Sequence, residues 1–225
     1  MTVASSEQSQ RVGQISMAGA WVHTDDTEMA LSIFEMLGHR GTIDTAELAV
    51  RFAERFRKDL GRGYGAMAAN RASAAAFRGV GSLGNGAAMR VAPLGAYFAE
   101  DPESRLREEV VASASVTHAH PEGKAGAIAV AVAAARASQL RDYPVAKARS
   151  ELLSAVFDRT PDGETRAGIA RAMKLPTDTA PETAARVLGN GSLVTAPDTV
   201  PYAGCGSIPR EWQDARERYD FEERE

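Results

Sequence analysis

A long alanine-rich stretch decides the fold class. Residues 124–140 have the sequence KAGAIAVAVAAARASQL, in which alanine surrounds Ile128, Val130 and Val132. Alanine loses no side-chain freedom in a helix, so this composition favours a helix over a strand. The apolar side chains cover most sides of the helix rather than one stripe, and such a helix is usually central in its bundle. We therefore expect an all-α protein built around residues 124–140.

Further helices are expected on both sides of this stretch. The expected helices are Thr24 to Gly38 (closed by Gly38 and Gly41), Asp44 to Leu60, Tyr64 to Arg78, Met89 to Ala99, Glu103 to Val116, Pro144 to Phe157, Glu164 to Met173 and Pro181 to Leu188. Asp44 and Glu47 form a capping-box pattern at the start of one of them. No run of alternating polarity predicts a strand, and no repeat has a solenoid spacing.

Length and composition predict one ordinary globular domain. The 225 residues, 44% hydrophobic and 25% charged, fit a single helical domain spanning 1–225, with residues 1–15 and 217–225 expected to be flexible. The net charge of −4 argues against broad nucleic-acid binding, which needs a basic face. Cys205 has no partner for an intrachain disulfide. Because neither a membrane span nor a secretory signal is visible, we expect no membrane association and a cytoplasmic location.

The densest group of oxygen side chains lies at the start of the first expected helix. Residues 23–30 have the sequence HTDDTEMA. The adjacent oxygens of Thr24, Asp25 and Asp26 suit a hard cation such as magnesium. They equally suit a helix N-terminus, because threonine can cap it and the helix dipole favours acidic residues in the first turn. The spacing alone leaves both interpretations open, and capping is the commoner one.

A glycine-rich loop is the second candidate site. Residues 84–93 have the sequence GNGAAMRVAP, and backbone N–H groups in such a loop can cradle a phosphate. The segment is not a Walker loop, because no Gly-Lys-Ser/Thr follows. It is not a dinucleotide-binding fingerprint either, because no strand precedes it. A tight turn between helices is the alternative.

The third candidate segment contains two histidines. Residues 117–123 have the sequence THAHPEG, with His118 and His120 two positions apart. Zinc binding is disfavoured because no further Cys/His cluster supplies the remaining ligands. A histidine directed at a sugar or a phosphate is one interpretation. A solvent-facing or helix-capping histidine is the other.

Together these three segments resemble the ADP-ribosylglycohydrolase family, in order and in spacing. Residues 188–191, 198–201 and 206–212 also resemble it, so that the similarity extends from about Gly19 to Trp212. Each motif is moderately specific, whereas the ordered set is strongly specific. The resemblance implies an orthogonal helical bundle around two magnesium ions. It also implies hydrolysis of the N- or O-glycosidic bond between ADP-ribose and an acceptor.

The resemblance assigns roles to individual residues. It implies metal ligands at Thr24, Asp25 and Asp26, with Asp25 and Asp26 also catalytic. It implies an ADP-ribose-binding cleft formed by Ser82, Gly84, Asn85, Gly86 and His118. Paired magnesium ions can orient ribose hydroxyls and activate water. Nearby carboxylates can stabilise the oxocarbenium-like transition state of glycosidic cleavage.

The chain also departs from the family pattern. The family's N-terminal Gly-Asp segment has no counterpart, and residues 202–206 join two segments that an Asp-x-Asp-Thr metal motif separates in the family. We therefore expect a shortened chain with half of the metal site, and exposed apolar surface that a homo-oligomer could cover. Three hypotheses remain. The chain is a working hydrolase, a non-catalytic protein that binds ADP-ribose, a nucleotide or a partner protein, or a fragment without a function of its own.

Overall fold

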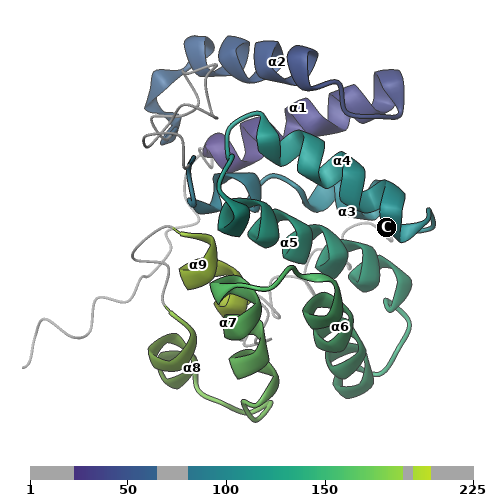
Figure 1. The fold of residues 1–225 in the computed structure, drawn as a ribbon, viewed down its shortest axis with the longest axis vertical. Coiled ribbons are helices and arrows are strands. Elements are labelled where there is room, and N and C mark those ends of the chain that lie inside the picture. Colours follow the sequence, from purple (N-terminus) through teal and green to yellow (C-terminus); the bar gives the residue numbers. More distant parts are fainter. Residues whose placement is uncertain (1–22, 65–80, 190–194, 204–225) are drawn as a thin grey trace, which may run out of the picture.

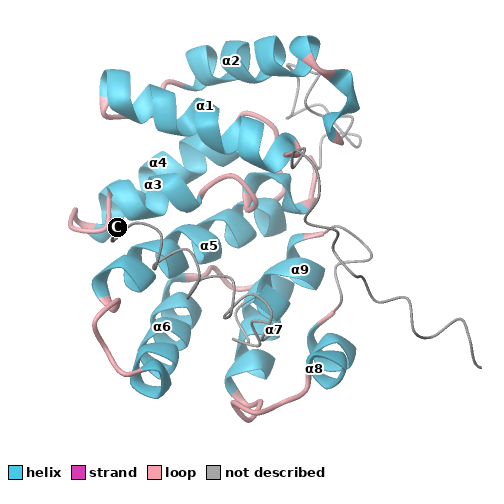
Figure 2. Cartoon of the chain, turned by 180° about the vertical axis from the view of Figure 1, so that it is seen from behind, coloured by secondary structure: helices cyan, strands magenta, loops and turns pink. Residues whose placement is uncertain are grey.

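The computed structural model describes residues 23–64, 81–189 and 195–203. These residues form helices and loops without a strand, and their single β-bridge pairs Gly84 with Thr195 (Figure 2). The all-α prediction is confirmed. The helix expected over residues 64–78 and the flexible ends expected at 1–15 and 217–225 lie outside the described residues, apart from Tyr64. No helix in the described ranges is both long and apolar enough to cross a bilayer.

The helices follow one another with short connections. In chain order the elements are α1 (Asp25–Arg40), α2 (Thr45–Lys58), the 3₁₀ turn η1 (Leu60–Arg62), the 3₁₀ turn η2 (Asn85–Ala87), α3 (Ala92–Tyr97), α4 (Glu103–Ser115), α5 (Pro121–Gln139), α6 (Val145–Arg159), α7 (Glu164–Met173), α8 (Pro181–Leu188) and α9 (Ala196–Ala203). α7 and α8 have the limits expected from the sequence, whereas α3 is shorter than expected and α9 was not expected.

α5 is the centre of the bundle, as its composition predicts. It contacts α3 and α4 on one side and α6, α7 and α9 on the other, while α1 and α2 lie at one end of the molecule (Figure 1). Ala127 and Ala131 are completely buried. A Cβ added to Gly126 would lie 2.6 Å from the Cβ of Ala196 in α9. Small residues on α5 therefore let neighbouring helices approach its backbone closely.

The ends of α1 and α2 show how local sequence sets the helix limits. α1 ends at Gly41, whose φ of 65° is left-handed and whose N–H donates to Leu37 O. The Asp44 carboxylate caps α2 by accepting from the N–H groups of Ala46 and Glu47, each at 3.0 Å. The other half of the predicted capping box does not form, because the Glu47 carboxylate pairs with arginine side chains instead.

α2 ends at Lys58, two residues before the end expected from the sequence. Asp59 leaves the helical conformation, with φ of −152°, and its carboxylate accepts a hydrogen bond from the N–H of Gly61 at 3.0 Å. The chain then turns through η1 to Gly63, which brings this corner of the molecule beside the start of α1.

Candidate functional site

The glycine loop is a tight turn fixed by its own hydrogen bonds. The N–H of Gly84 donates to Ser82 Oγ at 3.1 Å, and Asn85 O accepts from the N–H groups of Ala88 and Met89 at 2.8 and 3.0 Å. Ala196 at the start of α9 donates its N–H to Leu83 O at 3.1 Å. The segment is therefore a tight turn anchored to α9, and phosphate binding by its N–H groups stays a prediction.

His118 packs directly against the glycine loop. Its side chain is only 6% exposed, and its Nδ1 shares a 2.7 Å hydrogen bond with Thr117 Oγ1. A Cβ added to Gly86 would lie 2.8 Å from His118 Cε1 and 3.1 Å from Nε2, so the imidazole occupies the space that a side chain would need. A Cβ on Gly123 would meet Ser82 O at 2.8 Å and His118 Cβ at 3.3 Å. Ser82, Gly86 and His118 thus form one packed cluster.

The two histidines of residues 117–123 have different roles. His120 is the N-cap of α5, and its Nδ1 accepts from the N–H of Glu122 at 3.1 Å. The capping interpretation is confirmed for His120. The solvent-facing interpretation is wrong for His118, because the helix ends of α4 and α5 enclose its ring.

Burial sets the charge of His118. Loss of solvent, followed by the positive charge of Arg90, lowers the pKa of the imidazole to about 4. His118 is therefore neutral near pH 7. A neutral imidazole offers one donor and one acceptor nitrogen. Nδ1 is engaged by Thr117, and Nε2 lies on the side of the ring that faces Gly86.

Arg90 is a site residue that the sequence did not indicate. Its side chain is completely buried, and burial lowers its pKa to about 9. Nη1 donates to Gly86 O at 3.1 Å, Nη2 donates to Ser113 O at 2.9 Å, and the guanidinium lies over the Phe52 ring at 4.7 Å. Arginine is almost never fully buried without a partner, so its type predicted an exposed position. The only signal was its place within an otherwise apolar run, residues 87–95.

The acidic start of α1 is more open than the glycine loop. Thr24 and Asp26 are exposed, while Asp25 is partly buried. Burial, followed by the neighbouring charge of Asp26, raises the pKa of the Asp25 carboxyl. Thr24 occupies the N-cap position, but its hydroxyl makes no capping hydrogen bond. The side-chain capping interpretation is therefore wrong for Thr24, and its hydroxyl is not committed to the helix end.

The acidic turn is held in place by Glu28. This carboxylate shares a 2.6 Å hydrogen bond with His23 Nε2 and pairs with Arg55 of α2 and Arg62 of η1. The hydrogen bond from His23, then that from Arg55, lowers the pKa of Glu28. Within the described ranges no group of three or more His, Cys, Asp or Glu side chains is arranged to hold a metal ion. Within those ranges, Asp25 and Asp26 are thus two carboxylates without a third His, Cys, Asp or Glu placed to share a metal ion with them.

A chain of contacts joins the three candidate segments. Met29, one turn after Asp25, lies against Arg90 with 3.9 Å between Sδ and Nη1. Arg90 binds the carbonyl of Gly86, and Gly86 packs on His118. The acidic turn, the glycine loop and His118 are therefore parts of one packed region. Asn85 and Gly84 lie in the same turn, half-buried.

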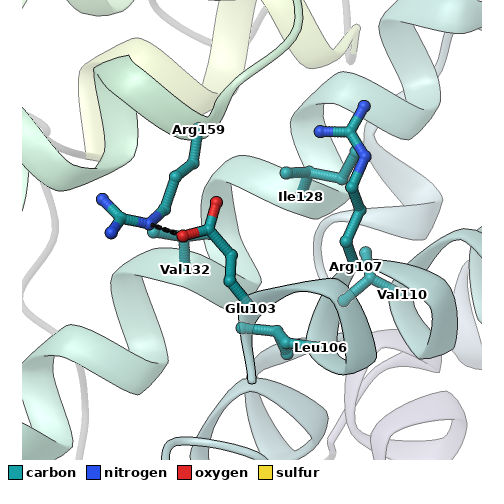
Figure 3. A pocket seen from close by; sticks show the side chains of 7 residues that line it. All are labelled: Glu103, Leu106, Arg107, Val110, Ile128, Val132 and Arg159. Atoms are coloured by element: carbon teal, nitrogen blue, oxygen red, sulfur yellow. Dashed lines mark hydrogen bonds and ion pairs between the residues drawn. The ribbon is translucent and has the colours of Figure 1, made fainter. Parts of the chain in front are cut away.

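The cavities along α4, α5 and α6 are small. Figure 3 shows one with a floor of Leu106, Ile128 and Val132, closed at one side by the ion pair of Arg159 with Glu103 at 2.7 Å. Its volume of about 10 Å³ is enough for roughly one water molecule. Two neighbouring hollows measure about 110 and 190 Å³, below the several hundred Å³ of typical ligand pockets.

Comparison with known proteins gives consistent matches. The family model described as ADP-ribosylglycohydrolase matches residues 3–223. ADP-ribosylhydrolase ARH3 of Homo sapiens is 36% identical over 121 residues, covering 48% of this chain and 33% of the relative. The ADP-ribosyl-[dinitrogen reductase] glycohydrolase of Rhodospirillum rubrum is 34% identical over 116 residues, covering 46% of this chain and 39% of the relative. The match thus spans between about a third and two fifths of these relatives.

Proposed function

Because this chain belongs to the ADP-ribosylglycohydrolase family, whose members use metal ions and act on ADP-ribosylated substrates, we propose that it binds an ADP-ribose-containing substrate and hydrolyses its glycosidic bond. The substrate is an ADP-ribosylated protein or a small ADP-ribose compound. The observation that carries this proposal is the contact of His118 with Gly86, which packs two segments 32 positions apart against each other.

The ligand-binding half of the proposal rests on the glycine loop. Ser82, Gly84, Asn85 and Gly86 present backbone groups and short polar side chains beside the neutral ring of His118. Short side chains allow a diphosphate to approach backbone N–H groups closely. His118 Nε2 supplies a hydrogen bond to a sugar hydroxyl or a phosphate oxygen. The charge of Arg90 behind the loop favours an anionic ligand.

The metal-binding half rests on the start of α1. Thr24, Asp25 and Asp26 would hold a magnesium ion, and the donor set fits in part. The Thr24 hydroxyl is free of the helix end, and partial burial, followed by the charge of neighbouring Asp26, raises the pKa of Asp25. A cation there would offset their repulsion. Bound magnesium supplies Lewis-acid polarisation of oxygen ligands, and water would complete its octahedral coordination.

A direct assay tests the proposed hydrolase. Purified protein is incubated with magnesium and with peptides ADP-ribosylated on arginine or on serine, and free ADP-ribose is quantified. An active member of the family serves as the positive control. Release of ADP-ribose that EDTA abolishes supports the proposal. No release, while that relative is active, contradicts it.

Removal of both carboxylates tests the metal site separately. We expect magnesium to raise the Tm of the wild type, because a ligand that binds the folded state stabilises it. Asp25→Asn combined with Asp26→Asn should abolish that rise. Glu164→Gln is the control, because Glu164 is an exposed acidic residue in the first turn of a different helix, α7. An unchanged response to magnesium in the double variant would rule out this metal site.

A second candidate function is a non-catalytic binding protein for ADP-ribose or a nucleotide. One observation favours it: the described residues assemble the glycine loop with His118 but contain no group of three acidic or histidine metal ligands. Isothermal titration calorimetry with ADP-ribose, with and without magnesium, distinguishes the two. Binding without turnover in the hydrolase assay supports the second function. Absence of heat under both conditions excludes it.

A further inference from the structure

Arg90 was given only a general electrostatic role above, yet its environment is unusual. Among the described residues its guanidinium binds backbone carbonyl oxygens, a sulfur atom and an aromatic face rather than a carboxylate. Its Nε is buried without a hydrogen-bond partner. Burying a positive charge in this way is costly. An arginine buried in this way therefore calls for an explanation beyond packing.

Arg90 and His118 meet at the same residue of the glycine loop. The guanidinium binds the carbonyl oxygen of Gly86 at 3.1 Å, and the imidazole of His118 covers the α-carbon of Gly86. The second carbonyl that Arg90 binds, Ser113 O at 2.9 Å, belongs to the last turn of α4, one turn before His118. One side chain therefore fixes the loop and the segment that carries the histidine relative to each other.

We propose that Arg90 is a positioning residue for ligand binding, which holds the glycine loop against His118 through its hydrogen bonds to Gly86 O and Ser113 O. This inference rests on the proposed function only for the identity of the ligand, ADP-ribose. The effect of Arg90 on the loop and on His118 does not depend on that identity.

Arg90 is the charged group that acts on His118. From the α4 side the imidazole meets the Thr117 hydroxyl, and the residues of η2 carry no ionisable side chain. From the α5 side, His120 turns its Nδ1 to the N–H of Glu122, whose carboxylate is bound by Thr165 of α7 at 2.7 Å. Burial disfavours the imidazolium, and the Arg90 charge disfavours it further.

Two single variants, Arg90→Lys and Arg90→Met, separate the charge of the side chain from the geometry of its hydrogen bonds. Lysine keeps the positive charge, but its single ammonium cannot reproduce the planar fork that joins Gly86 O to Ser113 O. Methionine fills similar volume and removes the charge. Arg107→Met is the matched control, because Arg107 is an exposed arginine on α4 and the formal charge lost is the same.

The first measurement is the NMR titration of the His118 Cε1 proton. In the wild type and in Arg107→Met, His118 should stay neutral from pH 8 to pH 5. Arg90→Met should raise its midpoint by about one pH unit, since burial, the larger cause, remains. Arg90→Lys should keep the low midpoint. A wild-type midpoint near 6.5, or no shift in Arg90→Met, would overturn the charge assignment, and the wild-type result applies even if the methionine variant does not fold.

The second measurement is calorimetry with ADP-ribose at pH 5.5 and 7.5. The wild type should bind equally at both values. Arg90→Lys should bind about tenfold more weakly, equally at both values, because the loop is loosened while the ring stays neutral. Wild-type affinity in Arg90→Lys would overturn the positioning role. If the wild type itself does not bind ADP-ribose, the proposed function fails, whereas the NMR titration still decides how Arg90 acts on His118.

Discussion

The glycine loop and the acidic start of α1 are both candidate ligand sites, and they are built in opposite ways. The loop is enclosed, with His118 on one side and the completely buried Arg90 on the other. The acidic turn is open, with Thr24 and Asp26 exposed and only Asp25 partly buried. Packing has therefore fixed the geometry of the first site before any ligand arrives, whereas the second depends on what binds to it.

This contrast indicates what would favour binding at each of the two sites. A preorganised loop binds a ligand without a large ordering cost. A pair of crowded carboxylates gains most from a bound cation, because the cation removes their mutual repulsion. The enclosed site should therefore respond strongly to changes in packing and pH, and the open site to changes in ionic conditions.

The largest expected effect concerns acid stability at the enclosed site. Burial lowers the pKa of His118 from its ordinary value of 6.5 to about 4 in the folded protein, so below pH 6.5 the unfolded chain takes up a proton that the folded protein does not. Stability present above pH 6.5 is lost as the pH falls toward 4. The loss amounts to about 3 kcal/mol in full. Urea unfolding at pH 7.5 and 4.5 should detect most of it.

His118→Gln should reduce this acid loss, because glutamine does not titrate. His39→Gln is the control, since His39 is exposed in the last turn of α1. It should retain the wild-type dependence on pH. An equal acid loss in wild type and His118→Gln would mean that the imidazole is solvated and that the site is not enclosed.

The second prediction tests the packing of the loop itself. Gly86→Ala places a methyl group 2.8 Å from His118 Cε1, closer than carbon atoms pack. Because both the ring and the turn are fixed, we expect a loss of about 1–3 kcal/mol. Gly38→Ala on α1 has nothing within 4 Å and should instead stabilise the protein by about 0.5–1 kcal/mol. Thermal unfolding of the two variants and the wild type measures both effects. A Tm of Gly86→Ala equal to that of the wild type would show that the loop shifts to accommodate the methyl group.

Local sequence predicted the helices that carry their own signals, and failed where packing overrides them. α5 was predicted to be central because apolar side chains cover most of its sides. α9 was missed because Pro201 lies inside it, where proline lacks the backbone donor of a helical residue. Its helical form depends on contacts with α7, where Pro201 occupies the space beside Gly168. Tertiary packing of this kind has no signature in a single sequence.

The candidate site, like the fold, was predicted only in part. The ordered motifs indicated the loop and His118, and the structure places these two together. The burial of Arg90 could not be predicted, because an arginine is normally solvated and one of its carbonyl acceptors, Ser113 O, lies 23 residues away in the chain. The roles of Thr24, Asp25 and Asp26 in metal binding stay a prediction.

The smallest expected effect distinguishes a metal-binding threonine from a capping one. Asp44 accepts two backbone hydrogen bonds at the start of α2, so Asp44→Ala should cost about 1 kcal/mol. Thr24 has the equivalent position on α1 but makes no such bond, and Thr24→Ala should cost only a few tenths of a kcal/mol without magnesium. With magnesium present, the Thr24 variant should lose part of the metal-dependent rise in Tm, whereas the Asp44 variant should keep all of it. A cost of 1 kcal/mol for Thr24→Ala in EDTA, with the magnesium response intact, would return this residue to the role of a helix cap and leave the open site without its hydroxyl ligand.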